Sequence, residues 1–122
     1  MMEETNIKKE KTFIATIYVG LQKGYAGSWC SKDTAVRIIQ AYVNEVGLCV
    51  TVKDTTFIYS LGGEDGLEIG LTNYPRFPSS PEKIVNLSLE LADLLMKELC
   101  QNRVTVVTTD TTYMLTNHIQ YD

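Results

Sequence analysis

The sequence predicts an α+β protein in which an antiparallel sheet carries two helices on one face. Two stretches with helical spacing of apolar residues, at about 31–46 and 81–101, separate stretches in which apolar and polar residues alternate. The resulting order is strand, helix, strand, strand, helix, strand, followed by one more strand in a hairpin. This is the ferredoxin-like order βαββαβ with an added C-terminal strand.

The first strand is predicted from Thr12 to Leu21, where Phe13, Ile17 and Val19 share one face with other apolar residues. Residues 1–11 are polar and charged, and we expect them to be loose. The second face of the strand also carries apolar side chains. We therefore expect this face of the sheet to be covered in part by another subunit. The residues that indicate such a contact are Ile14, Tyr18, Phe57 and Tyr59.

A glycine-rich loop follows, with Gly20, Gly24 and Gly27 at spacings that resemble those of phosphate-binding loops. No Lys-Ser or Lys-Thr pair follows, which favours a flexible connection over a phosphate cradle. Such a loop can still fold over a ligand, with Tyr25 or Trp29 as a lid.

The first helix is capped by Ser31 or Asp33 and stops at Gly47. Residues 48–52 and 56–60 are predicted strands, and the break at 53–55 is either a bulge or a short turn. Residues 62–66, Gly-Gly-Glu-Asp-Gly, predict a hairpin turn in which Glu64 and Asp65 are solvated.

A strand over 67–72 follows that turn, and the second helix runs from about Pro81 to Gln101. Residues 103–107 and 112–115 form the last two strands, joined by a turn at 108–111, and the tail from 116 should be loose.

Composition indicates one globular domain spanning residues 1–122. No apolar run approaches the roughly 20 residues that span a bilayer, and the N-terminus lacks the features of a signal peptide, so we expect a cytoplasmic protein. The net charge of −4 argues against binding to polymeric nucleic acid. Three cysteines and one histidine at no metal-binding spacing predict free, mostly buried thiols, with no metal and no cofactor.

Catalytic motifs are missing from the sequence. His118 lies in the predicted tail, no cysteine has a histidine beside it in the sequence, and no Gly-x-Ser-x-Gly occurs. We therefore expect a protein that is not an enzyme and has no catalytic residues.

The most distinctive stretch is the proline loop, Asn73 to Pro81, which holds all three prolines of the chain. It ends at a helix N-terminus capped by Ser79 or Ser80 and presents Arg76 and Phe77. An arginine and an aromatic ring beside such a terminus suit a ligand with phosphate and a flat base. The alternative is that the loop is only a packing clasp. The candidate ligand-binding residues are Phe77, Asn86, Arg103, Arg76, Tyr74 and Tyr25.

The chain resembles the first family of phage Thoeris anti-defence proteins over roughly residues 12–115. The segments that carry the resemblance are Thr16-Ile17-Tyr18-Val19-Gly20-Leu21, Lys23-Gly24-Tyr25, Gly47-Leu48-Cys49-Val50-Thr51-Val52, Phe57-Ile58-Tyr59, Glu64-Asp65-Gly66, Tyr74-Pro75-Arg76-Phe77-Pro78 and Gln101-Asn102-Arg103-Val104. Members of that family are non-enzymatic sponges that sequester the cyclic ADP-ribose isomer made by a bacterial TIR-domain protein.

The resemblance implies that Phe77 stacks on adenine, Asn86 hydrogen-bonds near it, and Arg103, with Arg76, holds phosphate. It also implies ligand pockets at a subunit interface, in a homodimer or hexamer, with a separate site for cyclic oligonucleotides in some members.

Two other classes of function stay open. The chain can be a small dimeric ferredoxin-like module for structure or protein interaction, with no nucleotide ligand. It can also be an enzyme that hydrolyses the signal.

Overall fold

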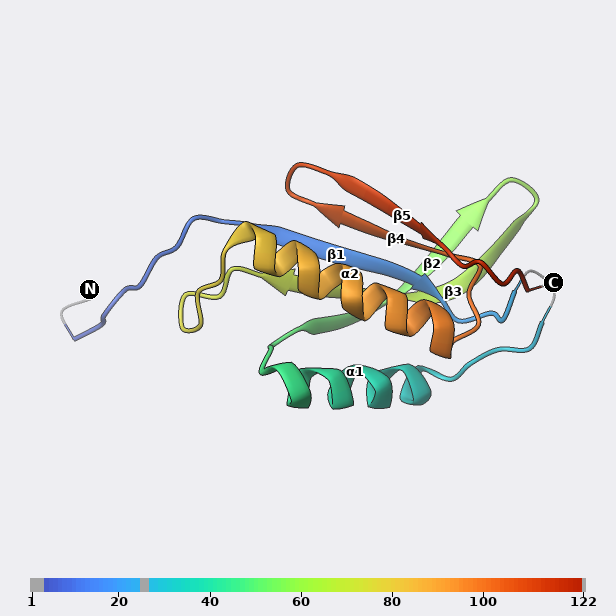
Figure 1. Ribbon diagram of the computed structural model, residues 1–122, viewed down its shortest axis with the longest axis horizontal. Coiled ribbons are helices and arrows are strands. Elements are labelled where there is room, and N and C mark those ends of the chain that lie inside the picture. The colour runs from blue at the N-terminus through green and yellow to red at the C-terminus, as the bar shows by residue number, and fades with distance from the viewer. Residues whose placement is uncertain (1–3, 25–26, 122) are drawn as a thin grey trace.

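The computed structural model describes residues 4–24 and 27–121, which form one antiparallel sheet with two helices on one face (Figure 1). The elements are β1 Ile14–Gly20, α1 Lys32–Val46, β2 Thr51–Tyr59, β3 Gly62–Thr72, α2 Pro81–Glu98, β4 Arg103–Thr108 and β5 Thr112–Thr116. The five strands lie in the order β2-β3-β1-β4-β5. This arrangement confirms the predicted fold class, because β1 lies between β3 and β4 as in a ferredoxin-like sheet and β5 extends the β4 edge.

The core lies between the sheet and the helices. Ala15, Ile17 and Val19 of β1 are fully buried, as are the residues at the same face of β3 and the apolar stripe of α2. α2 lies over the sheet and α1 beside α2 (Figure 1). The Tyr42 hydroxyl of α1 donates to Glu90 Oε1 at 2.8 Å.

Both helices begin at serine caps. Ser31 Oγ accepts from Thr34 N and Ser80 Oγ accepts from Lys83 N, which settles the two capping alternatives. α2 ends at Glu98, three residues earlier than predicted, because Cys100 adopts a left-handed conformation with φ 53°.

The hairpin between β2 and β3 differs from the prediction. β2 is continuous through 53–55, and the turn is Ser60-Leu61, since Tyr59 pairs with Gly62. Residues 62–66, expected to be the turn, are the first part of β3. Glu64 therefore lies on a strand opposite Phe57.

We call the face of the sheet opposite the helices the open face. β1 pairs with β3 only from Gly66 to Thr72, so residues 62–65 extend past β1 as part of a two-stranded arm. In Figure 1 this arm and the β4–β5 hairpin rise from the sheet as two separate ribbons. Large apolar side chains are exposed on the open face at Ile14, Val107 and Met114 and at the arm's Tyr59.

The segment after β5 is held in place, which the sequence did not indicate. Asn117 is buried, and Tyr121 hydrogen-bonds through its backbone to Asn102. The cysteines are free, but Cys49 is exposed and the other two are half-buried. Within the described residues, neither helix has the length and apolar character needed to cross a membrane.

Candidate functional site: a hollow on the open face

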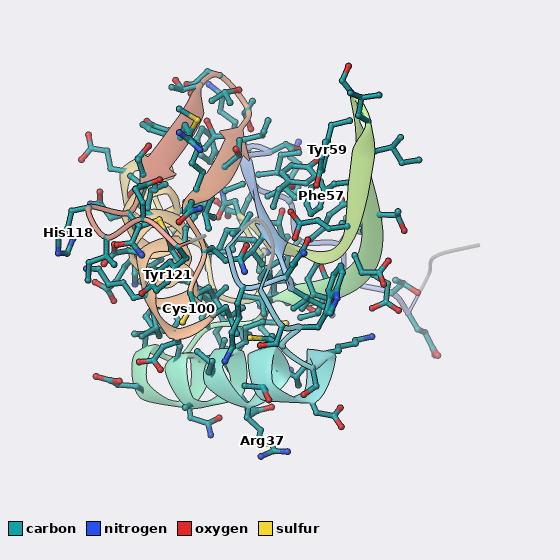
Figure 2. The ribbon with its side chains drawn as sticks, turned by 90° about the vertical axis from the view of Figure 1, so that its right-hand side faces the viewer. Arg37, Phe57, Tyr59, Cys100, His118 and Tyr121 are labelled. Atoms are coloured by element: carbon teal, nitrogen blue, oxygen red, sulfur yellow. The ribbon has the colours of Figure 1, made fainter. Side chains whose placement is uncertain are left out.

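A hollow of about 250 Å³ lies on the open face between the β2–β3 arm and β4. We call it the open-face pocket. It is lined by Tyr18, Gly20, Phe57, Tyr59, Glu64, Gln101, Arg103 and Thr105. Figure 2 shows Phe57 and Tyr59 on the side of the arm that faces β4 and β5. Aromatic, acidic, basic and amide side chains thus converge on one place, which is the usual composition of a small-molecule site.

Two paired glycines lie beneath this pocket: Gly20 of β1 lines it, and Gly66 of β3, opposite Gly20, lies under the ring of Phe57. A Cβ on Gly66 would lie 2.2 Å from Cε2 of Phe57, so the ring covers the space that a side chain would fill. A Cβ on Gly20 would lie 2.5 Å from Glu64 Oε2 and 3.0 Å from Gln101 Oε1. The absence of both side chains is what lets Phe57, Glu64 and Gln101 lie close to the sheet.

Glu64 is half-buried at the inner edge of the pocket, and its Oε2 accepts a hydrogen bond from Gln22 N at 3.3 Å. Burial raises the pKa of this carboxyl above its ordinary value, and the Gln22 N–H partly offsets that rise. A carboxyl with a raised pKa in a cleft is a candidate for a functional role.

Arg103 lies across the pocket at the start of β4 and is exposed. The guanidinium offers a planar pair of donors for a phosphate or carboxylate, and Glu64 offers acceptors for hydroxyl or ammonium groups. The pocket therefore suits a ligand that presents an anionic group at one end and hydroxyl or cationic groups at the other.

The proline loop forms a second, separate feature at the other end of the sheet. The rings of Tyr74 and Phe77 stack with centroids 6.3 Å apart, and Cζ of Arg76 lies 5.4 Å from the centroid of Phe77. The Asn73 side chain braces the loop, since it donates to Lys11 O and accepts from Ser79 N, both at 2.9 Å. Phe77 nevertheless remains 62% exposed, so most of its ring is accessible to a ligand.

The residues predicted to bind ligand are thus spread over several places. Tyr74 and Phe77 line a cavity of about 120 Å³ behind the proline loop. Asn86 lines a different groove, between the start of α2 and the β4–β5 turn. Arg103 belongs to the open-face pocket. Tyr25 lies outside the described residues.

The distance between the proline loop and Arg103 follows from the strand register. Thr72, just before the loop, pairs with Ile14 at one end of β1. Arg103 lies two residues before Thr105, which pairs with Tyr18 near the other end. At about 3.3 Å per residue, the six steps along the strand from Ile14 to Gly20 span roughly 20 Å. Within one chain, Phe77 and Arg103 do not share a pocket.

Sequence reasoning missed most of the open-face pocket. It placed Glu64 in a solvated turn and treated Phe57 and Tyr59 only as residues of a subunit contact. One signal was available: the alternation of 67–72 extends back through Gly66 and Glu64, which puts both on the face opposite Leu67.

Metal ligands are also scarce here. Among the described residues, no group of three or more His, Cys, Asp and Glu side chains is placed to hold a metal ion.

No protein-family model matches the chain, and no curated protein matches it in sequence. Solved structures do match. A phage SAM lyase in complex with S-methyl-5'-thioadenosine has a TM-score of 0.69 at 17% identity, over 93% of this chain and 95% of that chain. A phage SAM lyase in the apo state has the same TM-score at 18% identity, over 88% of this chain and 90% of that chain. At this identity the likeness establishes the fold.

The comparison corrects one expectation. From the missing catalytic motifs we expected a chain that is not an enzyme, yet these structural neighbours are lyases and contradict that expectation. The sequence analysis also discounted Glu64, which the register of β3 places in the open-face pocket.

Proposed function

We propose that this protein binds a small adenosine-containing ligand in the open-face pocket and thereby acts in phage anti-defence. The observation that carries the proposal is the convergence of Glu64, Arg103 and the aromatic pair Phe57 and Tyr59 on one hollow. Aromatic rings stack on adenine, a carboxylate accepts from ribose hydroxyls, and a guanidinium holds an acidic group. The lyase structure with bound S-methyl-5'-thioadenosine supports this ligand class.

The first candidate ligand is a cyclic ADP-ribose isomer, which the protein sequesters in the cytoplasm of the bacterial host. The resemblance to Thoeris anti-defence proteins supports this candidate. Arg103 holds the pyrophosphate, and we assign the remaining contacts to Phe77, Asn86, Arg76, Tyr74 and Tyr25. Because Phe77, Tyr74 and Asn86 line other hollows of the same chain, their contacts must come from other copies.

Sequestration by both Phe77 and Arg103 requires two copies of the chain, since the two lie at opposite ends of one sheet. The exposed apolar side chains of the open face, Ile14, Val107 and Met114, suit a contact between copies in a dimer or hexamer.

The second candidate is cleavage of SAM, and the charge of the pocket favours it. SAM has a cationic sulfonium and an ammonium group that suit Glu64, and a carboxylate that suits Arg103. Release of S-methyl-5'-thioadenosine from SAM breaks the bond between sulfur and Cγ of the methionine portion, and the electron pair stays on sulfur, which becomes a neutral thioether. SAM's own carboxylate forms the new bond to that carbon, so the methionine portion leaves as a lactone. Glu64 in its ionised form binds and orients the cationic substrate before this step.

A ligand panel tests the proposal and separates the candidates. Purified protein is titrated with cyclic ADP-ribose isomers, SAM, S-methyl-5'-thioadenosine and ATP as a control. Each is followed by calorimetry and by unfolding temperature. A ligand at 100 times its Kd should stabilise the folded protein by about 2.7 kcal/mol. Absence of binding by every adenosine compound would overturn the proposal.

The fate of the ligand is then read by mass spectrometry after heating the complex. Intact cyclic ADP-ribose indicates sequestration, and S-methyl-5'-thioadenosine formed from SAM indicates a lyase. A Glu64→Gln variant sharpens the result, because loss of the carboxylate should weaken SAM binding and strengthen binding of a doubly anionic nucleotide.

Mixed oligomers test whether two copies share one ligand. Phe77→Ala and Arg103→Ala variants are each prepared alone and then mixed after mild dissociation. If one site draws Phe77 from one copy and Arg103 from the other, a random equal mixture should recover about a quarter of the sites, because each site needs the intact residue from both copies. If both single variants are inactive and the mixture recovers no sites, Phe77 and Arg103 from two copies do not share one ligand.

A further inference from the structure

We propose that Asn102 and Asn117 are positioning residues that dock the C-terminal segment 117–121 and so hold Gln101 and Arg103 in the open-face pocket. The inference rests on the proposed function for its ligand, although its structural part stands on the contacts alone. Gln101, Asn102 and Arg103 are consecutive, and the first and third line the pocket. Asn102, between them, faces the C-terminal segment instead.

The docking contacts of the segment are reciprocal. Asn102 Nδ2 donates to Tyr121 O at 2.7 Å, and Tyr121 N donates back to Asn102 Oδ1 at 2.5 Å. Asn117 N donates to Asn102 O at 2.9 Å, and Asn117 Nδ2 donates to Gln101 O at 3.2 Å. Both asparagines are at least 95% buried, with exposures of 5% and 3%. Chain ends lacking such ties are usually poorly ordered, so these contacts mark the segment as part of the fold.

The Tyr121 side chain adds a third attachment. Its ring lies close to the side chain of Cys100, and Figure 2 shows the two residues together near the end of α2. Cys100 has φ 53°, a conformation in which glycine is the usual residue.

The contacts of Gln101 connect this docking to the pocket. Gln101 Nε2 donates to Gln22 O at 2.7 Å and to Leu99 O at 3.0 Å, which directs Oε1 toward Gly20 and Glu64. Gln22 N in turn donates to Glu64 Oε2. The C-terminal segment fixes the backbone of 101–102 from one side, and the Gln22 segment fixes the Gln101 side chain from the other. Because the backbone just before Arg103 is held on both sides, the position from which the Arg103 side chain extends is also held.

The test uses the full chain, an Asn102→Ala variant, and a chain ending at Thr116. The matched controls are Asn44→Ala and removal of residues 1–8. Asn44 is exposed on α1, where its side chain accepts a hydrogen bond from Gln40, and residues 4–8 are exposed. We expect the two test variants to bind the adenosine ligand on the order of tenfold more weakly, as when contacts that orient a binding group are lost. The controls should bind normally.

If Asn102 and the segment 117–121 only stabilised the fold, their loss would lower the unfolding temperature and leave the pocket side chains in place. The second readout is therefore the NMR signal and hydrogen exchange of the Gln101 side-chain amide, recorded without ligand well below the unfolding temperature. We expect faster exchange and a shifted signal in both test variants. An unchanged Gln101 amide, or unchanged affinity in folded variants, overturns the inference. If wild-type protein binds no adenosine compound, the proposed function fails while the NMR result still decides this inference.

Discussion

The two ends of the sheet present functional side chains in different ways. At the proline loop, three prolines and the Asn73 side chain hold Phe77 outward, and its ring is 62% exposed. At the open-face pocket, strand register brings together residues from β1, β2, β3 and β4 over a floor of two glycines. A stiff loop can present one aromatic ring with contacts from its own residues Tyr74 and Arg76, whereas a pocket with opposed charges needs several strands. Local stiffness and convergence of side chains are therefore independent signs of a site.

The largest expected effect comes from filling the pocket floor. In Gly66→Ala the new Cβ would meet Phe57 and also the Val19 carbonyl, at 2.5 Å, which the backbone must move to relieve. We expect a loss of about 1–3 kcal/mol in unfolding free energy, together with loss of ligand binding.

Gly70→Ala is the control for this change, because its Cβ would meet only the Thr51 hydroxyl, which can rotate. Chemical denaturation and calorimetry measure both quantities. If Gly66→Ala matches Gly70→Ala in stability and in affinity, the glycine floor is not required for the pocket.

The next effect concerns the charge that the pocket offers to an acidic group. Arg103→Ala should weaken binding by at least tenfold with little change in unfolding temperature, because hydrogen bonds to a charged group contribute about 1.5–3 kcal/mol. Arg103→Lys should lose part of the affinity, since lysine lacks the planar pair of donors.

Arg37→Ala, on the outer side of α1 in Figure 2, is the matched control. Titration at two salt concentrations checks the assignment. If the wild-type affinity does not fall as the salt concentration rises, the assignment of Arg103 to an anionic group of the ligand is wrong.

A direct contrast of the two ends uses Phe77→Ala and Tyr59→Ala. Stacking of a base on an aromatic ring contributes roughly 1–3 kcal/mol. Removal of the ring that stacks on adenine should therefore weaken ligand binding by about one to two decades. We expect Tyr59→Ala to lose this affinity for every adenosine ligand. We expect Phe77→Ala to lose it only where two copies of the chain share the ligand. A Phe77→Ala protein that melts earlier but binds normally would instead identify the proline loop as a packing clasp.

The smallest effect is a pH dependence from Glu64. Its pKa is raised in the folded protein, so the folded state binds more protons than the unfolded state just above pH 4.5, the ordinary value. Stability contributed by Glu64 should therefore be present at lower pH and be lost as pH rises through the raised pKa.

Glu64→Gln should remove this decline, and Asp65→Asn, at an exposed neighbour, should keep it. Unfolding free energies between pH 4 and 8 provide the measurement. A Glu64→Gln protein with the wild-type pH profile would contradict the assignment.

Much of the fold was predictable because it depends on local patterns. The alternation in 12–21 and the helical stripe after Pro81 each bury one face, whatever the rest of the chain does. Turn position was less predictable, since Gly62 and Gly63 are typical turn residues. The structure instead places the turn at Ser60-Leu61, with Leu61 at φ 63°. That register puts Phe57 opposite Glu64 and its ring over Gly66.

The sequence by itself determined the α+β class, the order of helices and strands along the chain and the stiff loop that presents Phe77, because periodicity and proline geometry act over short stretches. Only the tertiary structure decided which side chains meet. Glu64 and Arg103 are far apart in the sequence, and they line one pocket because the pairing of β3 and β4 with β1 places both at the same end of the open face. A shift of one residue in either pairing would turn these side chains to the other face of the sheet.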